Sequence, residues 1–254
     1  MCLLLLRHKS VHFSMRTGIQ VGISINIAIQ LARIAPLVRN CSGGIMLGRQ
    51  KMHFRPPAWT PLLISELEKL GITAEKDEIF QPDGFCERYL EKIGWPKLES
   101  LDFSDIEGSE YIHDLSEPVA DELTDKFDLI YDGGTTEHVF DIAQAFRNVD
   151  AMLKDNGIFV SCVGTDGWFG HGFYQVGPDI PWRYWGASLG YKVLGCWTFS
   201  RKGRDLPRDI ADPTTSARGA EHRYRDPQFI FYVVQKQERR GPPSPVIQSH
   251  YINY

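Results

Sequence analysis

The sequence predicts an α/β fold: a doubly wound sheet of about seven strands, mostly parallel, with an antiparallel final strand pair. Three observations predict it. Short apolar segments alternate with amphipathic helical segments through most of the chain. Several apolar segments end in an acidic residue, as buried parallel strands do at a ligand-binding edge. The last two, at 191–199 and 229–234, have no helical segment between them, so we expect them to form an edge hairpin.

The N-terminal part is predicted to contain three helices and one strand. Isoleucine and leucine recur at helical spacing in the first helix, which we expect Pro36 to end. Another helical segment has proline near its start and Gly71 just after its end, the usual asymmetry of helix termini. We expect these elements at about 20–35 (helix), 43–47 (strand), 61–70 (helix) and 83–93 (helix).

The following part reads as strands and helices in alternation. Its strands are short apolar segments, and the dipeptide Asn156-Gly157 predicts a turn before one of them. The helices are an amphipathic segment and one rich in Trp and Tyr. We expect strands at 98–103, 110–115, 128–131 and 158–163, and helices at 137–153 and 178–189.

These elements suggest one main domain with a segment at each end. Residues 1–40 form an N-terminal segment with an amphipathic helix, and residues 41–237 form the main domain. The polar, aperiodic stretch 201–226 reads as a loop insertion within that domain. Residues 238–254 form a proline-rich tail.

Composition narrows the classes of function. The net charge of −4, from 28 basic and 32 acidic residues, gives no electrostatic footprint for a nucleic-acid partner. The five cysteines are scattered without a CxxC, which favours reduced thiols in a cytoplasmic protein. No stretch reads as a secretory signal or as a membrane span. The oligomeric state is not indicated.

The segment 127–141, FDLIYDGGTTEHVFD, is the clearest sign of a ligand site. An apolar strand ends at Asp132, two glycines follow, and the chain then enters a helical segment. Ligands of open α/β sheets lie outside the carboxyl ends of the strands. The segment therefore predicts where in the fold the chemistry occurs.

Three blocks resemble class I S-adenosylmethionine-dependent methyltransferases. They are LDFSDIEGSEYIHDLSEP at 101–118, FDLIYDGGTTEHVFD at 127–141 and GHGFYQVGP at 170–178. The order of elements over roughly 20–236 is also similar to that superfamily. The resemblance implies a Rossmann-like fold, with 41–237 as a methyltransferase-like domain, and S-adenosylmethionine as the cofactor.

The resemblance also implies roles for residues at the strand ends. Asp102 would bind the ribose hydroxyls of the cofactor, since a carboxylate accepts two hydroxyl donors. Asp114 and the adjacent Leu115 would approach the adenine. Asp132 and Gly133 would face the methionine end of the cofactor and the substrate.

One segment departs from the family pattern. A loop similar to GxGxG is expected after the first strand, but this chain has Leu47-Gly48-Arg49-Gln50 there. Only Gly48 is free of a side chain for close approach of the backbone to the cofactor. The departure leaves open a chain that keeps the fold but binds a different ligand, or none.

The candidate catalytic and substrate-binding residues lie in the second and third blocks. His138 and His171 are candidate general bases, because histidine titrates near neutral pH. The candidate substrate-binding residues are Glu137, Trp168, Phe173 and Tyr174. No HxxxH, HxH or CxxC spacing is present, so no metal ligands are assigned from the sequence.

The function that these observations favour is S-adenosylmethionine-dependent methyl transfer to a small-molecule or glycan-type acceptor. Such a reaction depends mainly on alignment of the acceptor, the methyl carbon and the sulfur. Two alternatives stay open, because one fold hosts many functions. One is a catalytically inactive binding or assembly protein with the same fold. The weaker one is a metal-dependent hydrolase that uses a His/Asp cluster at one edge of the sheet, made of His113, Asp114, Asp132, His138 and His171.

Overall fold

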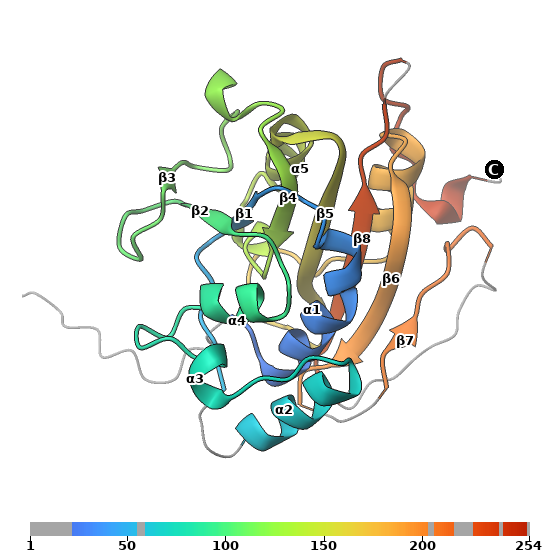
Figure 1. Ribbon diagram of the computed structural model, residues 1–254. Helices are drawn as coiled ribbons and strands as arrows, with labels where there is room; N and C mark the ends of the chain where they lie inside the picture. The colour runs from blue at the N-terminus through green and yellow to red at the C-terminus, as the bar shows by residue number, and fades with distance from the viewer. Residues whose placement is uncertain (1–21, 55–58, 203–205, 216–225, 239–240, 253–254) are drawn as a thin grey trace, which may run out of the picture.

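The computed structural model describes residues 22–54, 59–202, 206–215, 226–238 and 241–252. A single eight-stranded sheet crosses the molecule, with β3 at one edge and β7 at the other (Figure 1). Its strands are β1 (Gly44–Leu47), β2 (Leu98–Asp102), β3 (Tyr111–Ile112), β4 (Phe127–Asp132), β5 (Leu153–Asp166), β6 (Lys192–Ser200), β7 (Arg208–Asp209) and β8 (Gln228–Gln235).

The strand order is β3-β2-β1-β4-β5-β8-β6-β7. Strands β1 to β5 run parallel, whereas β8 is antiparallel to both β5 and β6, and β7 is antiparallel to β6. The predicted mostly parallel sheet with an antiparallel final pair is confirmed. The chain has the Rossmann-like fold that the resemblance to class I methyltransferases implies.

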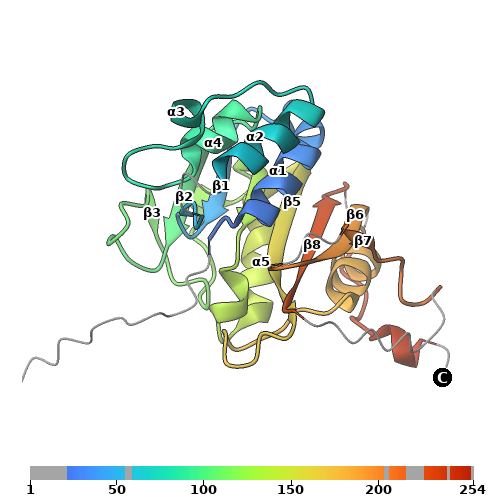
Figure 2. The same cartoon turned by 90° about the horizontal axis from the view of Figure 1, so that it is seen from below.

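Helices cover both faces of the sheet. Viewed from below, α1, α2, α3 and α4 lie on one side of the strands and α5 on the other (Figure 2). The helix η3, which is of the π type, packs with α5 against the second face. The bounds are α1 Ile25–Val38, α2 Thr60–Lys69, α3 Lys76–Ile79, α4 Glu87–Lys92, α5 Ile142–Met152 and η3 Ile180–Ser188, with short 3₁₀ turns at Asp121–Leu123, Thr136–His138 and Ser249–Tyr251.

The side chains of β8 explain why it is an interior strand. Alternate residues of a strand point to opposite faces, and both faces of β8 are apolar and buried. Phe229, Phe231 and Val233 join the core under α1, while Ile230, Tyr232 and Val234 join the core under α5 and η3. The expected antiparallel pair forms at this end of the sheet, with β8 as its inner strand between β5 and β6, and the two-residue β7 adds a further strand outside β6.

The first helix differs from the prediction at both ends. It begins at Ile25, where the Ser24 hydroxyl accepts from the Ile27 N–H, and it continues through Pro36 to Val38. Proline in the last turn removes one N–H donor, and the next turn still closes because Arg39 N donates to Ala35 O at 3.0 Å. Residues 20 and 21 of the predicted helix lie outside the described residues.

Strand β5 is longer than the predicted 158–163. It includes the expected turn at Asn156-Gly157, where Asn156 adopts a left-handed φ of 64°. The strand persists because Asn156 N donates to Lys236 O at 3.1 Å, so the ladder to β8 resumes. A register shift between β4 and β5 near Phe127 absorbs the irregularity.

Helix α5 starts later than the predicted residue 137. Residues 136–138 form a 3₁₀ turn instead, and Asp141 caps α5 by accepting from Gln144 N at 3.0 Å. Glu137 and His138 therefore belong to the loop after β4. Among the described helices, none combines the length and the apolar character that crossing a bilayer needs.

Candidate functional site

A cavity of about 290 Å³ lies at the carboxyl ends of β2 and β3, beside the loop that follows β4. Its volume is near the lower end of the range for ligand sites, about 300–1,000 Å³. Four predicted site residues line it, which are Asp102, Asp114, Leu115 and His138. Its other lining residues are Leu101, Phe103, His113, Ser116, Thr135, Val139 and Phe140.

Asp102 is the last residue of β2 and faces the turn after β1. Its Oδ1 accepts from Ser104 N at 3.3 Å. Gly48 lies opposite with a φ of +67°, and a Cβ there would be 3.8 Å from Asp102 Oδ2 and 2.7 Å from Thr135 Oγ1. The missing side chain at Gly48 therefore lets the Thr135 hydroxyl approach the backbone of this turn closely, where it donates to Leu47 O at 2.6 Å.

The segment after β3 forms another wall of the cavity. Asp114 is exposed and accepts from Ser116 N at 2.8 Å, while Leu115 is buried. Asn148 of α5 fixes this segment, because its Nδ2 donates to Leu115 O at 3.0 Å and to Glu117 O at 2.8 Å. The helix under the sheet thus positions an acid and an apolar side chain at the cavity.

Asp132 and Gly133 are not among the residues that line the cavity. The buried Asp132 carboxylate accepts from backbone and hydroxyl donors of its own turn and of β5. These donors are Gly134 N (3.2 Å), Thr135 N (2.8 Å), Thr136 N (3.3 Å), Thr136 Oγ1 (2.6 Å) and Ser161 Oγ (3.1 Å). Asp132 therefore orders the loop that carries Glu137 and His138.

Glu137, His138 and His171 converge beside the cavity. One ligand-type atom from each lies within 4.8 Å of the others, and the two imidazole rings meet edge to face at 4.8 Å between centroids. Burial raises the pKa of Glu137 to about 8, and the charge of Asp132 adds to that rise. Desolvation lowers the pKa of His138, and for His171 the neighbouring His138 and Arg201 add to that lowering.

The 168–175 loop is tied to the β4 loop by the backbone of Glu137. The Glu137 carbonyl accepts from Phe173 N at 2.8 Å and from Tyr174 N at 3.2 Å. Gly172 makes this approach possible, because its φ is +71° and a Cβ there would lie 2.8 Å from the Glu137 carbonyl oxygen. These two hydrogen bonds hold the 168–175 loop so that His171 lies next to His138.

The predicted aromatic residues of this loop occupy different environments. Trp168 is buried, its Nε1 donates to Gln228 O at 2.6 Å, and its ring lies 4.9 Å from that of His171. Phe173 is exposed and packs edge to face on Phe140, whereas Tyr174 donates its hydroxyl to Phe140 O at 2.7 Å. The Trp168 ring therefore packs against the His171 ring, and Phe173 and Tyr174 both contact Phe140, which lines the cavity.

The sequence prediction missed several residues of this site. Thr135, Val139 and Phe140 lie in the block that indicated a ligand site, so proximity to His138 was a usable signal. Phe103 directly follows the predicted Asp102, and His113 directly precedes the predicted Asp114. Their side-chain directions depend on how β2 and β3 end, which the sequence pattern did not specify.

The departure from a Gly-rich loop has a structural counterpart. Gln50 is buried, and its Nε2 donates to Leu47 O at 3.2 Å and to Gly48 O at 3.1 Å. Arg49 turns away to Glu87, with Nε 2.6 Å from Oε1, and stacks on Phe85. The Gln50 side chain thus hydrogen-bonds backbone carbonyls of this turn, which the glycines of a Gly-rich loop would leave without a side-chain partner.

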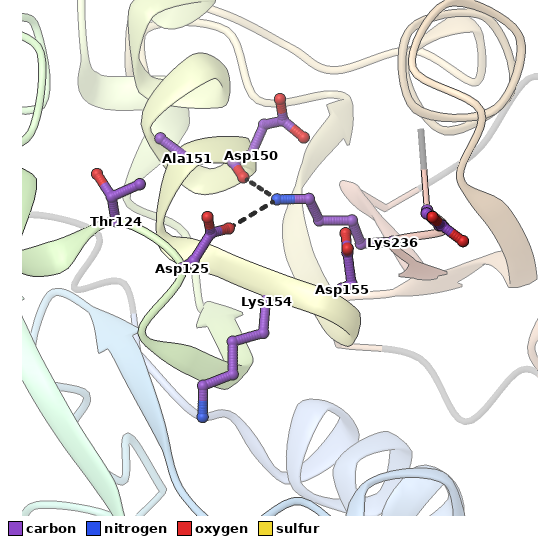
Figure 3. Close-up of a pocket in the computed structure, with 8 residues that line it drawn as sticks. Thr124, Asp125, Asp150, Ala151, Lys154, Asp155 and Lys236 are labelled. Carbon is purple, nitrogen blue, oxygen red and sulfur yellow. Dashed lines mark hydrogen bonds and ion pairs between the residues drawn. The ribbon is translucent and has the colours of Figure 1, made fainter. Parts of the chain in front are cut away.

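A wider cavity of about 570 Å³ lies at the other end of the strands, beside the starts of β4 and β5 (Figure 3). Lys236 crosses it, and Nζ lies 3.3 Å from Asp125 Oδ1 and donates to Asp150 O at 2.8 Å. None of the predicted site residues lines this cavity. We therefore place the candidate site at the carboxyl edge, by chemistry and not by cavity size.

No protein-family model matches this chain, and no curated protein sequence matches it. Its similarity to known proteins is confined to solved structures at low identity.

One similar structure is Burkholderia thailandensis 1,6-didemethyltoxoflavin-N1-methyltransferase with 1,6-didemethyltoxoflavin and S-adenosylhomocysteine bound. Its identity is 11% and its TM-score 0.43, over 84% of this chain and 78% of that chain. Another is the N-methyltransferase NodS from Bradyrhizobium japonicum, at 14% identity and a TM-score of 0.42, over 84% of this chain and 96% of the other. An S-adenosylmethionine-dependent methyltransferase from Mesorhizobium loti matches at 18% identity and a TM-score of 0.37, over 59% and 84%. At these scores the functional case rests on this chain's own residues.

Proposed function

We propose that this protein transfers a methyl group from S-adenosylmethionine to a small-molecule or glycan-type acceptor. The observation that carries the proposal is the cavity at the carboxyl ends of β2 and β3, lined by Asp102 and Asp114. Acids at these strand ends suit the hydroxyl and amino groups of a nucleoside. The four described cysteines are free thiols, which is compatible with a cytoplasmic location.

The residues of the cavity fit the nucleoside part of this cofactor. Asp102 offers a carboxylate for the ribose hydroxyls, next to the turn that contains Gly48. Asp114 and Leu115 offer a polar and an apolar contact for the adenine. The loop of Asp132 and Gly133 would lie toward the methionine end, with Asp132 shaping the loop instead of contacting the cofactor.

The acceptor side is proposed to be the loop pair that holds His138 and His171. When bound, S-adenosylmethionine supplies an electrophilic methyl group, and a hydroxyl acceptor must lose a proton as it attacks. His138 or His171 would take that proton, because their lowered pKa values leave a neutral imidazole at pH 7. Glu137, Phe173 and Tyr174 would position the acceptor, and Trp168 would support His171.

The test is calorimetry with S-adenosylmethionine and S-adenosylhomocysteine. We expect both to bind the wild-type chain and Asp102→Asn to weaken both by about tenfold, since hydrogen bonds to a charged group contribute roughly 1.5–3 kcal/mol. Asp105→Asn is the matched control, because Asp105 is an exposed acid on the same connection and does not line the cavity. Equal affinities for the wild type and Asp102→Asn would remove the ribose role.

A second candidate is a binding protein that keeps the fold without methylating. The observation that favours it is Gln50, whose side chain bonds the backbone of the β1 turn in place of a Gly-rich loop. The same calorimetry separates the two candidates. Binding of neither S-adenosylmethionine nor S-adenosylhomocysteine would favour the second.

A further inference from the structure

We propose that Glu137, His138 and His171 form a binding site for one divalent transition-metal ion, such as Zn²⁺, at the mouth of the candidate cavity. Two imidazoles and one carboxylate are a ligand set that such ions accept. The ligands come from the loop after β4 and from the 168–175 loop. The His/Asp cluster considered from the sequence contains His138 and His171 but not Glu137, which lies 34 positions before His171.

The separations are close to those that an ion needs. One donor atom from each residue lies within 4.8 Å of the other two. In a tetrahedral site with bonds of about 2.1 Å, the ligand atoms would be roughly 3.4 Å apart. Small side-chain rotations therefore suffice to close the set around an ion.

The burial of Glu137 is the independent observation that points to a ligand. This side chain is only 1% exposed, and its Oε2 has no hydrogen-bond partner within the described part of the chain. A buried polar atom without a partner destabilises the folded state. A bound cation would satisfy this oxygen.

The site is held in place before any ion binds. The Glu137 carbonyl accepts from Phe173 N and Tyr174 N, His171 N donates to Trp168 O at 3.0 Å, and the Trp168 ring backs the His171 ring. His138 lines the cavity and is exposed, so the ion would keep open coordination positions toward it. Such an open site is typical of catalytic metals and not of structural ones.

The charged side chains that face the site come from two elements. The buried Asp132 at the end of β4 acts on both Glu137 and His138 and favours a cation. Arg201, just after β6, acts on His171 and stacks 5.3 Å from the centroid of the Trp168 ring, which opposes a cation. The carboxyl groups of Asp132 and Glu137 together outweigh the guanidinium of Arg201, so the net electrostatic interaction favours a divalent ion.

The role of the ion rests on the proposed methyl transfer. A metal at the cavity mouth would bind an oxygen of the acceptor and lower the pKa of a hydroxyl there, so that its proton passes to water before attack. With the ion bound, this would replace the direct proton transfer proposed above for His138 or His171. This would specify acceptors with an oxygen that can coordinate, such as vicinal hydroxyls of a sugar or a phenol. Metal binding itself does not depend on that role.

The experiment uses the full chain, stripped with a chelator and titrated with Zn²⁺ by calorimetry and with Co²⁺ by visible absorption. We expect one ion per chain, and a loss of affinity of at least about 100-fold in Glu137→Gln and in His171→Ala, since each loses a direct ligand. His113→Ala is the matched control, because His113 lines the same cavity outside the cluster. It should bind the ion as the wild type does.

Each outcome decides the proposal. Absence of stoichiometric binding, or equal affinity in the wild type, Glu137→Gln and His171→Ala, would overturn it, the latter because the ion would then bind elsewhere. S-adenosylhomocysteine calorimetry on the same variants keeps the two proposals apart. Metal binding without cofactor binding would retain the metal site and refute the methyltransferase. Cofactor binding without metal binding would retain the methyltransferase and refute the metal site.

Discussion

At the scale of single residues, the carboxyl group of Glu137 is the most unusual group of the site. It is buried between the β4 loop and the 168–175 loop, and burial raises its pKa to about 8 from 4.5. Its neighbour Asp132 has its oxygens occupied by donors, so Glu137 holds the unsatisfied oxygen. At neutral pH the group is therefore protonated unless a cation or a ligand donor stabilises its charge.

Glu137→Gln should change how stability depends on pH. The folded state keeps a proton that the unfolded state releases above pH 4.5, so the wild type should lose stability as pH rises from 4.5 to 8, at up to about 1.4 kcal/mol per pH unit. The variant should lack this slope. Urea unfolding of metal-free protein at pH 5, 6.5 and 8 measures it, and the exposed Glu117→Gln should run parallel to the wild type. Parallel curves for Glu137→Gln would show that Glu137 ionises normally.

At the scale of elements, α5 positions the far wall of the cavity. Strand β3 has only two residues, so the segment that follows it needs other support. Asn148 supplies this support with all of its polar atoms: Nδ2 bonds Leu115 and Glu117, and Oδ1 accepts from Val119 N at 3.2 Å and from Gln144 Nε2 at 2.8 Å. A short strand is thus held by the helix beneath it.

Asn148→Ala should therefore affect both stability and ligand binding. It removes the side-chain partner of Leu115 O and of Val119 N and one of the two partners of Glu117 O, which should cost roughly 1–3 kcal/mol of unfolding free energy. We expect S-adenosylhomocysteine to bind several-fold more weakly, because Asp114 and Leu115 lose their fixed position. Gln144→Ala, which removes two side-chain hydrogen bonds within the same helix, should keep the affinity within about twofold. Unchanged affinity in Asn148→Ala would argue that this wall is not part of the site.

At the scale of the whole molecule, the two ends of the strands serve different purposes. The carboxyl ends of the parallel strands carry the candidate site. At their amino ends, Lys236 reaches across the second cavity to Asp125 and Asp150 (Figure 3). This lysine is 9% exposed and donates to Leu153 O at 2.6 Å as well as to Asp150 O, and it pairs with Asp125. It connects the end of β8 to the ends of α5 and the start of β5.

Lys236→Met should lower stability and leave the ligand site intact. A buried ammonium with three partners is replaced, so we expect a loss of about 2 kcal/mol in unfolding free energy. Lys154→Met, which removes an exposed ion pair with Asp128, should cost less than about 1 kcal/mol. Urea unfolding measures both. A fall in S-adenosylhomocysteine affinity in Lys236→Met similar to that in Asp102→Asn would show that the two ends are coupled.

The sequence by itself determined the fold class and most of the strands. Apolar runs of strand length, separated by helical periods, specify a doubly wound sheet because each pattern can bury its apolar side chains in only one kind of element. The acids at the ends of β2 and β3 were readable for the same reason: a buried strand ends where polar residues begin. Hence Asp102 and Asp114 were predicted, and both line the cavity.

Only the tertiary structure decided the strand order at β8, the structural role of Asp132 and the meeting of Glu137, His138 and His171. The apolar faces of β8 require burial on both sides, but they do not say between which strands. Likewise, the hydrogen bond from Phe173 N to the Glu137 carbonyl, 36 positions earlier, leaves no periodic signal in the sequence. Local patterns record which side chains are buried, whereas long-range contacts depend on how the buried surfaces pack together.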